Sequence, residues 1–340
     1  MVRGALAALA PVLAAVLALG AGSLCAPRSA AADSNDLVMS RLATRITDDT
    51  GRVLAVVGQN LEFRALASQL GVVLAPHLLS PADTLGFAGF QFDADVSQTS
   101  IDSIQPYWRV LAGTRDPGGM NHIAHGAGVL RTVGMFARKG LWLPAPSFEL
   151  GAGAVHLVGS TIWAAQVYGK LAVHEGFHDL PIPSIAIRGG VSRMMNQREL
   201  DLTIGSFDAT VSRHFGIGGT WRLDPFAGYD LLIIVPRSQV IDATPDVDPL
   251  APGNQMDVAN NFVFGDQANI TRQRFLLGAK LQYSVLQITL EAQFALAGSS
   301  VDSRPGATAA CQPSSTTTSC NAPDTAASQT TISLSAGFDF

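Results

Sequence analysis

The chain has 340 residues, of which 47% are hydrophobic and 14% charged, and its formal net charge is −5. An acidic chain of this kind is a poor partner for nucleic acid, whose phosphates attract basic surfaces. Beyond the N-terminal residues, no stretch offers about 18 consecutive apolar residues, which excludes a helical membrane protein.

Residues 1–32 have the pattern of an export signal. Arg3 precedes an apolar run from Ala5 to Leu19, and Ala30-Ala31-Ala32 matches an A-x-A cleavage site. The alternative is a retained membrane anchor, but the run falls short of the roughly 20 residues that span a bilayer. We therefore expect the mature chain to begin at Asp33. Cleavage removes Arg3 and Arg28 and no acidic residue, which takes the net charge from −5 to −7.

Residues 33–84 form a separate segment in which apolar residues recur at helical spacing. These are Leu54, Val57, Leu61, Ala65, Leu66, Leu70 and Val73. Pro76 ends the run. The spacing predicts one amphipathic helix from about Arg52 to Leu74.

After Leu85 the apolar period changes from helical spacing to two. In the clearest example Leu286, Ile288 and Leu290 alternate with Gln287, Thr289 and Glu291. Ten segments of this kind are found, at 85–97, 128–139, 146–157, 161–173, 184–194, 199–212, 218–235, 270–282, 285–297 and 330–340. Strands of soluble proteins average near five or six residues. Segments of about ten or more have the length that a tilted strand needs to cross a bilayer.

The connections between these segments differ in length on the two sides. Those on the side of the chain ends are short, whereas the opposite side holds three long ones at 98–127, 236–269 and 298–329. Short turns opposite long external loops are typical of outer-membrane barrels. We predict an all-β fold, a transmembrane antiparallel up-and-down β-barrel over residues 85–340. It has about ten strands, or twelve if a long loop hides a hairpin. Residues 33–84 then either plug the barrel or lie on its periplasmic side.

The C-terminal segment alternates up to its last, aromatic residue, with Phe338 and Phe340 on the apolar face. It resembles the C-terminal β-signal of Gram-negative outer-membrane β-barrel proteins, including porins. This resemblance implies an outer-membrane location, with membrane lipid and the barrel assembly machinery as partners. A plug-like segment followed by Pro81-Ala82 and a barrel also resembles the plan of FadL-type transporters.

Two cysteines remain in the mature chain, Cys311 and Cys320, within a Ser/Thr-rich stretch. Exported chains meet an oxidising compartment, so we predict a disulfide in the last long loop. Two free thiols are the alternative.

Two patterns could carry hydrolytic chemistry. His174-Glu175-Gly176-Phe177-His178 matches the zinc-protease motif H-E-x-x-H, for which Glu199 could add a third ligand. That chemistry needs a helix, and Gly176 and Pro181 disfavour one here, so we predict a polar turn without metal. The omptin proteases use two acidic pairs and a histidine. Asp93 and Asp95 form one D-x-D, but the chain has no D-x-H.

Charged residues on the polar face of the strands are expected to face the lumen, because charges disfavour lipid. The candidates are Asp93, Asp95, Glu149, Lys170, Arg188, Arg222, Asp224, Arg272, Arg274, Lys280, Glu291 and Asp339. We predict a non-enzymatic protein without a cofactor that passes or binds a small solute across the outer membrane. The alternatives are a structural or surface-display barrel without an open pore, and a zinc metalloprotease built on His174, Glu175 and His178.

Overall fold

The computed structural model describes residues 33–49, 53–77, 79–114, 128–142, 147–176, 182–244, 260–303, 305–307, 309–312 and 320–340. The predicted export signal, residues 1–32, lies outside the described residues. Residues 33–340 form one compact unit. No helix in the described ranges has both the length and the apolar character to cross a membrane.

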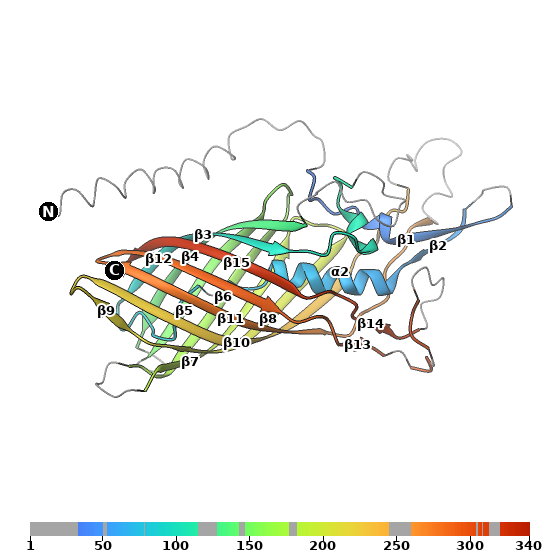
Figure 1. Ribbon diagram of the computed structural model, residues 1–340. Helices are drawn as coiled ribbons and strands as arrows, with labels where there is room; N and C mark the ends of the chain where they lie inside the picture. The colour runs from blue at the N-terminus through green and yellow to red at the C-terminus, as the bar shows by residue number, and fades with distance from the viewer. Residues whose placement is uncertain are drawn as a thin grey trace. The chain divides into compact units, whose positions relative to one another are not determined.

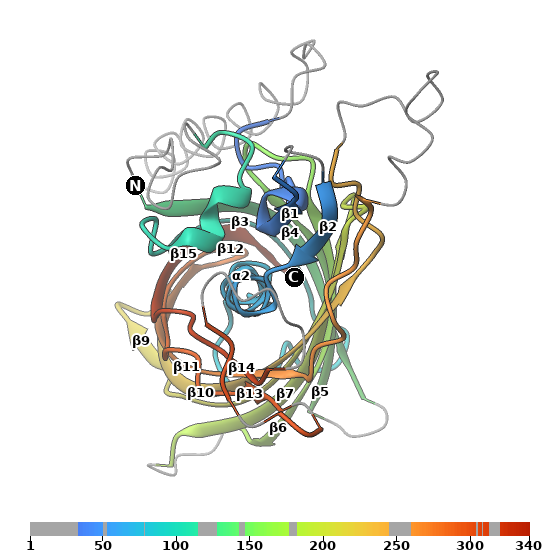
Figure 2. The same ribbon diagram turned by 90° about the vertical axis from the view of Figure 1, so that its right-hand side faces the viewer.

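Ten long antiparallel strands close into a barrel (Figures 1 and 2). They are β3 (Phe90–Ser100), β4 (Val129–Leu141), β5 (Phe148–Leu157), β6 (Trp163–His174), β7 (Ser184–Met195), β8 (Leu200–Ser212), β10 (Trp221–Ser238), β11 (Ile270–Tyr283), β12 (Leu286–Ala295) and β15 (Gln329–Asp339). Each strand pairs with its neighbour in this order, and β15 pairs with β3. The predicted ten-stranded barrel is thereby confirmed.

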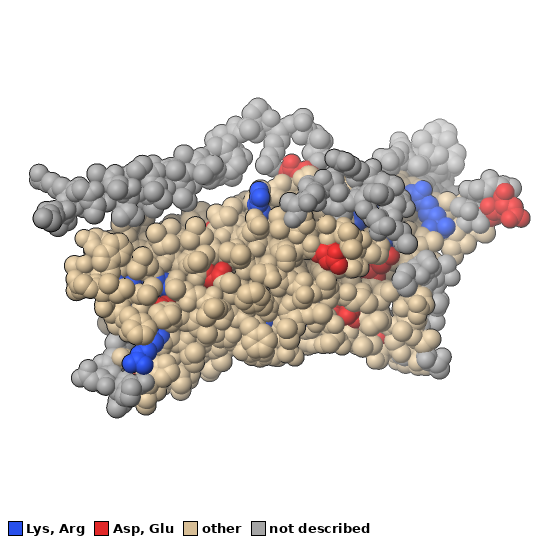
Figure 3. All heavy atoms as spheres, in the orientation of Figure 1, with Lys and Arg blue, Asp and Glu red and all other residues tan. Residues whose placement is uncertain are grey.

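The outer face of the barrel wall is apolar, whereas its inner face carries the buried charged side chains. Leu277, Leu290 and Ile332 each leave more than half of their surface exposed. The adjacent Leu276, Glu291 and Ser333 point inward and are buried. Figure 3 shows few charged side chains on the wall that faces the viewer. Such an exterior is suited to hydrocarbon, and a closed strand barrel leaves no backbone edge unpaired in lipid. The protein is an outer-membrane β-barrel.

The two ends of the barrel differ. One end, called here the short-turn end, joins strands by brief connections such as 284–285 and carries exposed aromatic residues, among them Phe90, Trp142 and Phe340. The other, the long-loop end, carries 101–128, 239–269 and 296–328. Aromatic girdles mark membrane interfaces, and short turns face the periplasm. The long-loop end therefore faces outward.

The N-terminal segment passes through the barrel. It begins at the long-loop end, where Asn35 N–H donates to Gly159 O at 2.7 Å. It continues through η1 (Met39–Leu42) and a hairpin of β1 (Ala43–Thr47) and β2 (Val53–Gly58). Helix α2 (Asn60–Val73) then lies inside the barrel (Figure 2), and residues 74–89 continue to β3 at the short-turn end.

The predicted helical start at Arg52 was wrong. Residues 53–58 form β2 instead, and the helix begins at Asn60. Val53, Val56 and Val57 are β-branched and favour an extended strand once β1 supplies a partner. Helix α2 itself occupies the half of the lumen near the long-loop end.

An apolar core surrounds α2 in the outward half of the lumen. Phe63, Leu66 and Leu70 of the helix belong to one buried cluster with Trp108 of η2 (Pro106–Val110) and Ile234 of β10. The packing is close, because a Cβ added at Gly71 would lie 2.5 Å from Ile234 Cδ1.

Three further short strands follow β3, of which the first pairs with β10 and the other two pair with each other. They are β9 (Phe215–Ile217), β13 (Val301–Asp302) and β14 (Ala322–Pro323). Near β14 the predicted disulfide between Cys311 and Cys320 is confirmed. Cys311 packs in a small buried cluster with Leu61 at the start of α2. The disulfide therefore lies against the outward end of the plug, the name used here for α2 and residues 74–85.

Candidate functional site in the barrel lumen

The residues expected in the lumen lie on inward-facing strand positions. Asp93, Asp95, Glu149, Lys170, Arg188, Asp224, Arg272, Arg274, Lys280 and Glu291 are each at most 5% exposed. Arg222 keeps 36% of its side chain exposed near the short-turn end. The structure distributes these residues around the wall and does not gather them into one site.

Most of the lumen charges are held in ion pairs. The pairs are Lys170–Glu149 at 3.1 Å, Arg188–Asp208 at 3.0 Å, Arg138–Asp93 at 3.5 Å, Arg222–Asp224 at 2.8 Å, Lys280–Asp339 at 3.0 Å, and Arg274–Asp230. Sequence reasoning missed Arg138, Asp208 and Asp230. All three lie on the polar face of strands in which apolar and polar residues alternate. The same alternation in the sequence could therefore have identified them.

Wall side chains hold the backbone of residues 74–85. Gln166 Nε2 and Ser192 Oγ donate to Leu74 O at 3.1 and 2.7 Å. Arg138 donates to Leu79 O at 3.3 Å, and Lys170 donates to Asp83 O at 2.7 Å. This segment belongs to no strand or helix, so its buried carbonyls need partners from side chains. The lumen charges therefore anchor the plug as well as neutralise one another.

The opposite wall, formed by β12, β15 and β3, has polar atoms without partners. His77 of the plug lies 3.2 Å from Ser97 Oγ and 3.7 Å from Asp95 Oδ2. Within the described part of the chain, the atoms without a hydrogen-bond partner here include His77 Nε2, Asp95 Oδ1, Gln287 Oε1 and Nε2, Thr289 Oγ1 and Glu291 Oε2. Buried polar groups are normally bonded to protein or to ordered water. This wall, which we call the polar wall, can therefore accept water or a small polar solute.

The zinc-protease motif falls at the short-turn end. His174 is the last residue of strand β6, and His178 lies outside the described residues. The Glu175 carboxylate accepts hydrogen bonds from Thr84 N–H at 3.0 Å and from Ser147 Oγ at 2.9 Å. Glu199, which could have added a third ligand, lies instead at the long-loop end, where it accepts a hydrogen bond from Met39 N–H at 3.0 Å. The described residues contain no cluster of three or more metal-binding side chains.

Comparisons with known proteins give similarity of overall architecture only. No family model and no curated protein sequence matches the chain. Among solved structures, Ail of Yersinia pestis is 9% identical, with 75% of this chain and 99% of Ail covered and a TM-score of 0.27. The outer-membrane protease OmpT of Escherichia coli is 7% identical, with 74% and 96% covered and a TM-score of 0.30.

LpxR of Salmonella typhimurium is 10% identical, with 72% of this chain and 99% of LpxR covered and a TM-score of 0.28. At such identities and TM-scores these likenesses assign no activity to the chain. The resemblance to FadL-type transporters is not shown by any of the three.

Proposed function

We propose that this protein is a closed outer-membrane barrel that acts at the cell surface. Its working part would be the outward cap, which we define as residues 33–58 together with the connections of the long-loop end. The observation that carries this proposal is the position of α2. All of its residues are buried in the outward half of the lumen, where a solute would have to pass.

Withdrawal of α2 would be energetically unfavourable. Phe63 stacks on Phe264 with ring centroids 4.3 Å apart, and Leu66 and Leu70 are fully buried. Each such side chain contributes roughly 1.5–3 kcal/mol when it is removed from water. Gln69 also accepts a hydrogen bond from Trp108 Nε1 at 2.9 Å. A helix packed in this way favours permanent closure over gating.

The outward cap offers surface for a partner. Leu54, Ile104 and Val240 are each more than 60% exposed although they lie beyond the membrane-facing strands. Exposed apolar groups outside the membrane belt often mark interaction sites. Strands β1 and β2 form a separate two-stranded sheet, and unpaired strand edges can bind an extended segment of another protein.

Conductance and surface labelling test this proposal together. The purified protein should be silent in planar bilayers, and an epitope inserted after Asp49 should bind antibody on intact cells. The same epitope inserted after Trp142 is the matched control, which should react only after permeabilisation. A steady wild-type conductance, or labelling of the Asp49 epitope only in permeabilised cells, would contradict closure or surface display, respectively.

A second candidate function is the binding or passage of a small polar solute along the polar wall. Its support is the set of buried atoms without partners around Glu291 and Thr289. Passage would require α2 and the adjoining residues 74–85 to move, so a covalent lock at Ala82 should stop it. Ala82 N–H donates to Ser212 Oγ at 3.0 Å, which makes Ala82→Cys with Ser212→Cys a suitable pair.

The lock is best tested in a background with Cys311→Ser and Cys320→Ser, so that reductant acts on the new bond alone. Sugar or amino-acid flux into liposomes should fall on oxidation and return on reduction if passage occurs. The single variant Ala82→Cys is the control. Equal flux in the locked and unlocked states would rule out passage by this route.

A further inference from the structure

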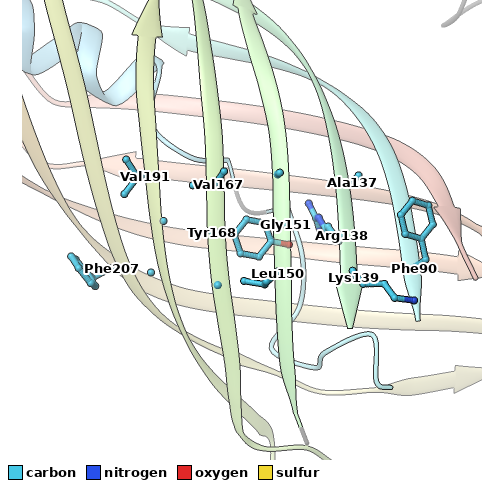
Figure 4. A pocket seen from close by; sticks show the side chains of 14 residues that line it. Phe90, Ala137, Arg138, Lys139, Leu150, Gly151, Val167, Tyr168, Val191 and Phe207 are labelled. Atoms are coloured by element: carbon cyan, nitrogen blue, oxygen red, sulfur yellow. The ribbon is translucent and has the colours of Figure 1, made fainter. Parts of the chain in front are cut away.

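The lipid-facing wall has a groove of about 580 Å³ across β4 to β8 (Figure 4). Leu150, Val167, Val191 and Phe207 border it and are each exposed by more than 45%, so the groove opens on the outer face. The buried Arg138 and Tyr168 also line it. A neighbouring groove of about 520 Å³ shares Gly169, Gly189 and Phe207 with it. The two therefore form one continuous groove on the lipid-facing wall.

The groove follows one cross-strand row of the sheet. Lys139 pairs with Leu150, Leu150 with Gly169, Gly169 with Gly189, and Gly189 with Phe207. Strands in such barrels tilt by about 35–45°, so a row perpendicular to them rises through the bilayer. The row therefore runs from the short-turn interface at Lys139 toward the bilayer centre.

Two glycines create the groove, and the backbone does not require either of them. A Cβ at Gly189 would lie 3.5 Å from Phe207 Cε1, and a Cβ at Gly169 would lie 3.4 Å from Phe148 Cζ. Both are ordinary contacts, whereas at inward-facing Gly151 a Cβ would lie 2.2 Å from Tyr168 Cε1. Glycine weakens a strand interior, so its use at two paired outward positions needs another reason.

A cation lies where the groove reaches the membrane interface. Lys139 is exposed beside Phe90, and its Nζ donates to Ala88 O at 2.6 Å (Figure 4). Among the described residues, no carboxylate lies within ion-pair distance of it. Neighbouring strands are about 4.8 Å apart, so Lys139 and Gly189 are separated by about 14 Å. The groove thus has a positive charge at its interfacial end and apolar side chains along its border.

We propose that this groove binds one phospholipid of the periplasmic leaflet. One acyl chain lies over Gly169 and Gly189, and the phosphate contacts Lys139. The apolar border of the groove, together with Lys139 as the exposed cation among its lining residues, favours this occupant over a second copy of the chain. A second copy would bring a second Lys139 to the same site under two-fold symmetry. The proposal is independent of any passage through the lumen.

Native mass spectrometry of the full protein in detergent tests the site, with dioleoylphosphatidylglycerol as the probe. The wild type should retain one equivalent. Gly189→Leu should bind about tenfold more weakly, because filling the groove removes the apolar contact of about two methylene groups. Gly169→Val is a second variant in case the first fails to fold. Ala292→Leu, at an outward position of β12 on the far side of the barrel, is the matched control and should bind like the wild type.

The charge contribution is separated with a lipid that lacks phosphate. Lys139→Gln should weaken binding of dioleoylphosphatidylglycerol and leave binding of dioleoylglycerol unchanged. Equal binding of phosphatidylglycerol by wild type and Gly189→Leu would overturn the proposal. A wild-type dimer that Gly189→Leu converts to monomer would also overturn it, because the groove would then be a protein interface.

Discussion

Phe90 and Phe340 exchange two backbone hydrogen bonds, each with an N···O distance of 2.8 Å. They continue the β3–β15 ladder beyond the pair Gln91–Asp339 and close the barrel at the short-turn end. In lipid, a backbone group that loses its partner costs several kcal/mol. Phe340 thus completes the seam between β3 and β15.

Deletion of Phe340 is predicted to impair assembly. It removes both hydrogen bonds to Phe90 and an aromatic side chain that is 68% exposed at the membrane interface. We also propose that Phe338 and Phe340 are read by the barrel assembly machinery. Heat-modifiable migration of outer-membrane fractions should show much less folded protein for the deletion. Phe340→Tyr, which keeps an aromatic ring and the backbone, should assemble normally. Equal folded bands for deletion and wild type would refute the prediction.

Arg274→Met is predicted to destabilise the barrel by about 3–5 kcal/mol, because it leaves Asp230 buried without its cation. The double variant Arg274→Met with Asp230→Leu should recover most of that loss, since it removes the uncompensated charge. Arg274 also donates to Gln293 Oε1 and Pro76 O, and both variants lose these bonds equally. Urea unfolding in micelles measures the difference. A double variant no more stable than the single one would argue against the ion pair.

Replacing Cys311 and Cys320 with alanine is predicted to loosen the outward end of the plug. Closing so short a loop stabilises the folded chain by at most about 3 kcal/mol, and Leu61 of α2 packs in the same cluster. Limited proteolysis of intact cells should cleave the variant faster within the outward cap. The wild type treated with reductant should behave in the same way. Unchanged cleavage in both would show that the disulfide does not support the plug.

Glu199 is predicted to make stability depend on pH. Burial raises the pKa of the Glu199 carboxyl, while the hydrogen bond from Met39 N–H opposes that rise. Because the folded-state pKa exceeds the unfolded one, the folded chain binds the proton more tightly. The resulting destabilisation is absent below about pH 4, grows as the pH rises through the folded-state pKa, and is complete above it.

Glu199→Gln keeps an acceptor for Met39 and has no charge to bury. It should therefore unfold at higher urea than the wild type at pH 8, and the advantage should disappear near pH 4. Asp201→Asn is a suitable control, because Asp201 forms an exposed ion pair with Arg193. An advantage of equal size at both pH values would contradict the assigned cause.

The His174–His178 segment is predicted not to bind zinc tightly. His174 ends a strand, and the Glu175 carboxylate already accepts hydrogen bonds from Thr84 and Ser147. A metalloprotease needs two histidines one helical turn apart and a glutamate free to act as base. Elemental analysis of protein purified without chelator should find well under one zinc per chain. One zinc per chain that is lost in His178→Ala would contradict the prediction.

Local patterns explain why so much of the barrel could be predicted. Each strand has one face in lipid and one in the lumen, so its residues alternate whatever its neighbours are. The predicted segment 270–282, for example, matches β11 to within one residue. The exposed Leu290 and buried Glu291 show the same alternation on β12. Cys311 and Cys320 are close in sequence, and their pairing needed only the exported context.

Partners far apart in sequence could not be predicted in this way. Arg274 pairs with Asp230 across 44 residues only because β10 and β11 adopt a particular register. Residues 53–58 fit a helical period, yet they form β2 because β1 lies beside them. The spacing of the apolar residues favours a helix here, whereas pairing with β1 favours a strand. The structure shows that the pairing with β1 prevails.

The barrel, its strands and its disulfide could all be predicted from the amino-acid sequence, because alternation and cysteine spacing are properties of neighbouring residues. The entry of the N-terminal segment from the long-loop end, and the position of α2 in the lumen, became evident from the folded chain alone. The same holds for the single row that Lys139, Leu150, Gly169 and Gly189 form on the outer face. Both features depend on strand register and on packing inside a closed cylinder, and neither leaves a periodic signal along the chain.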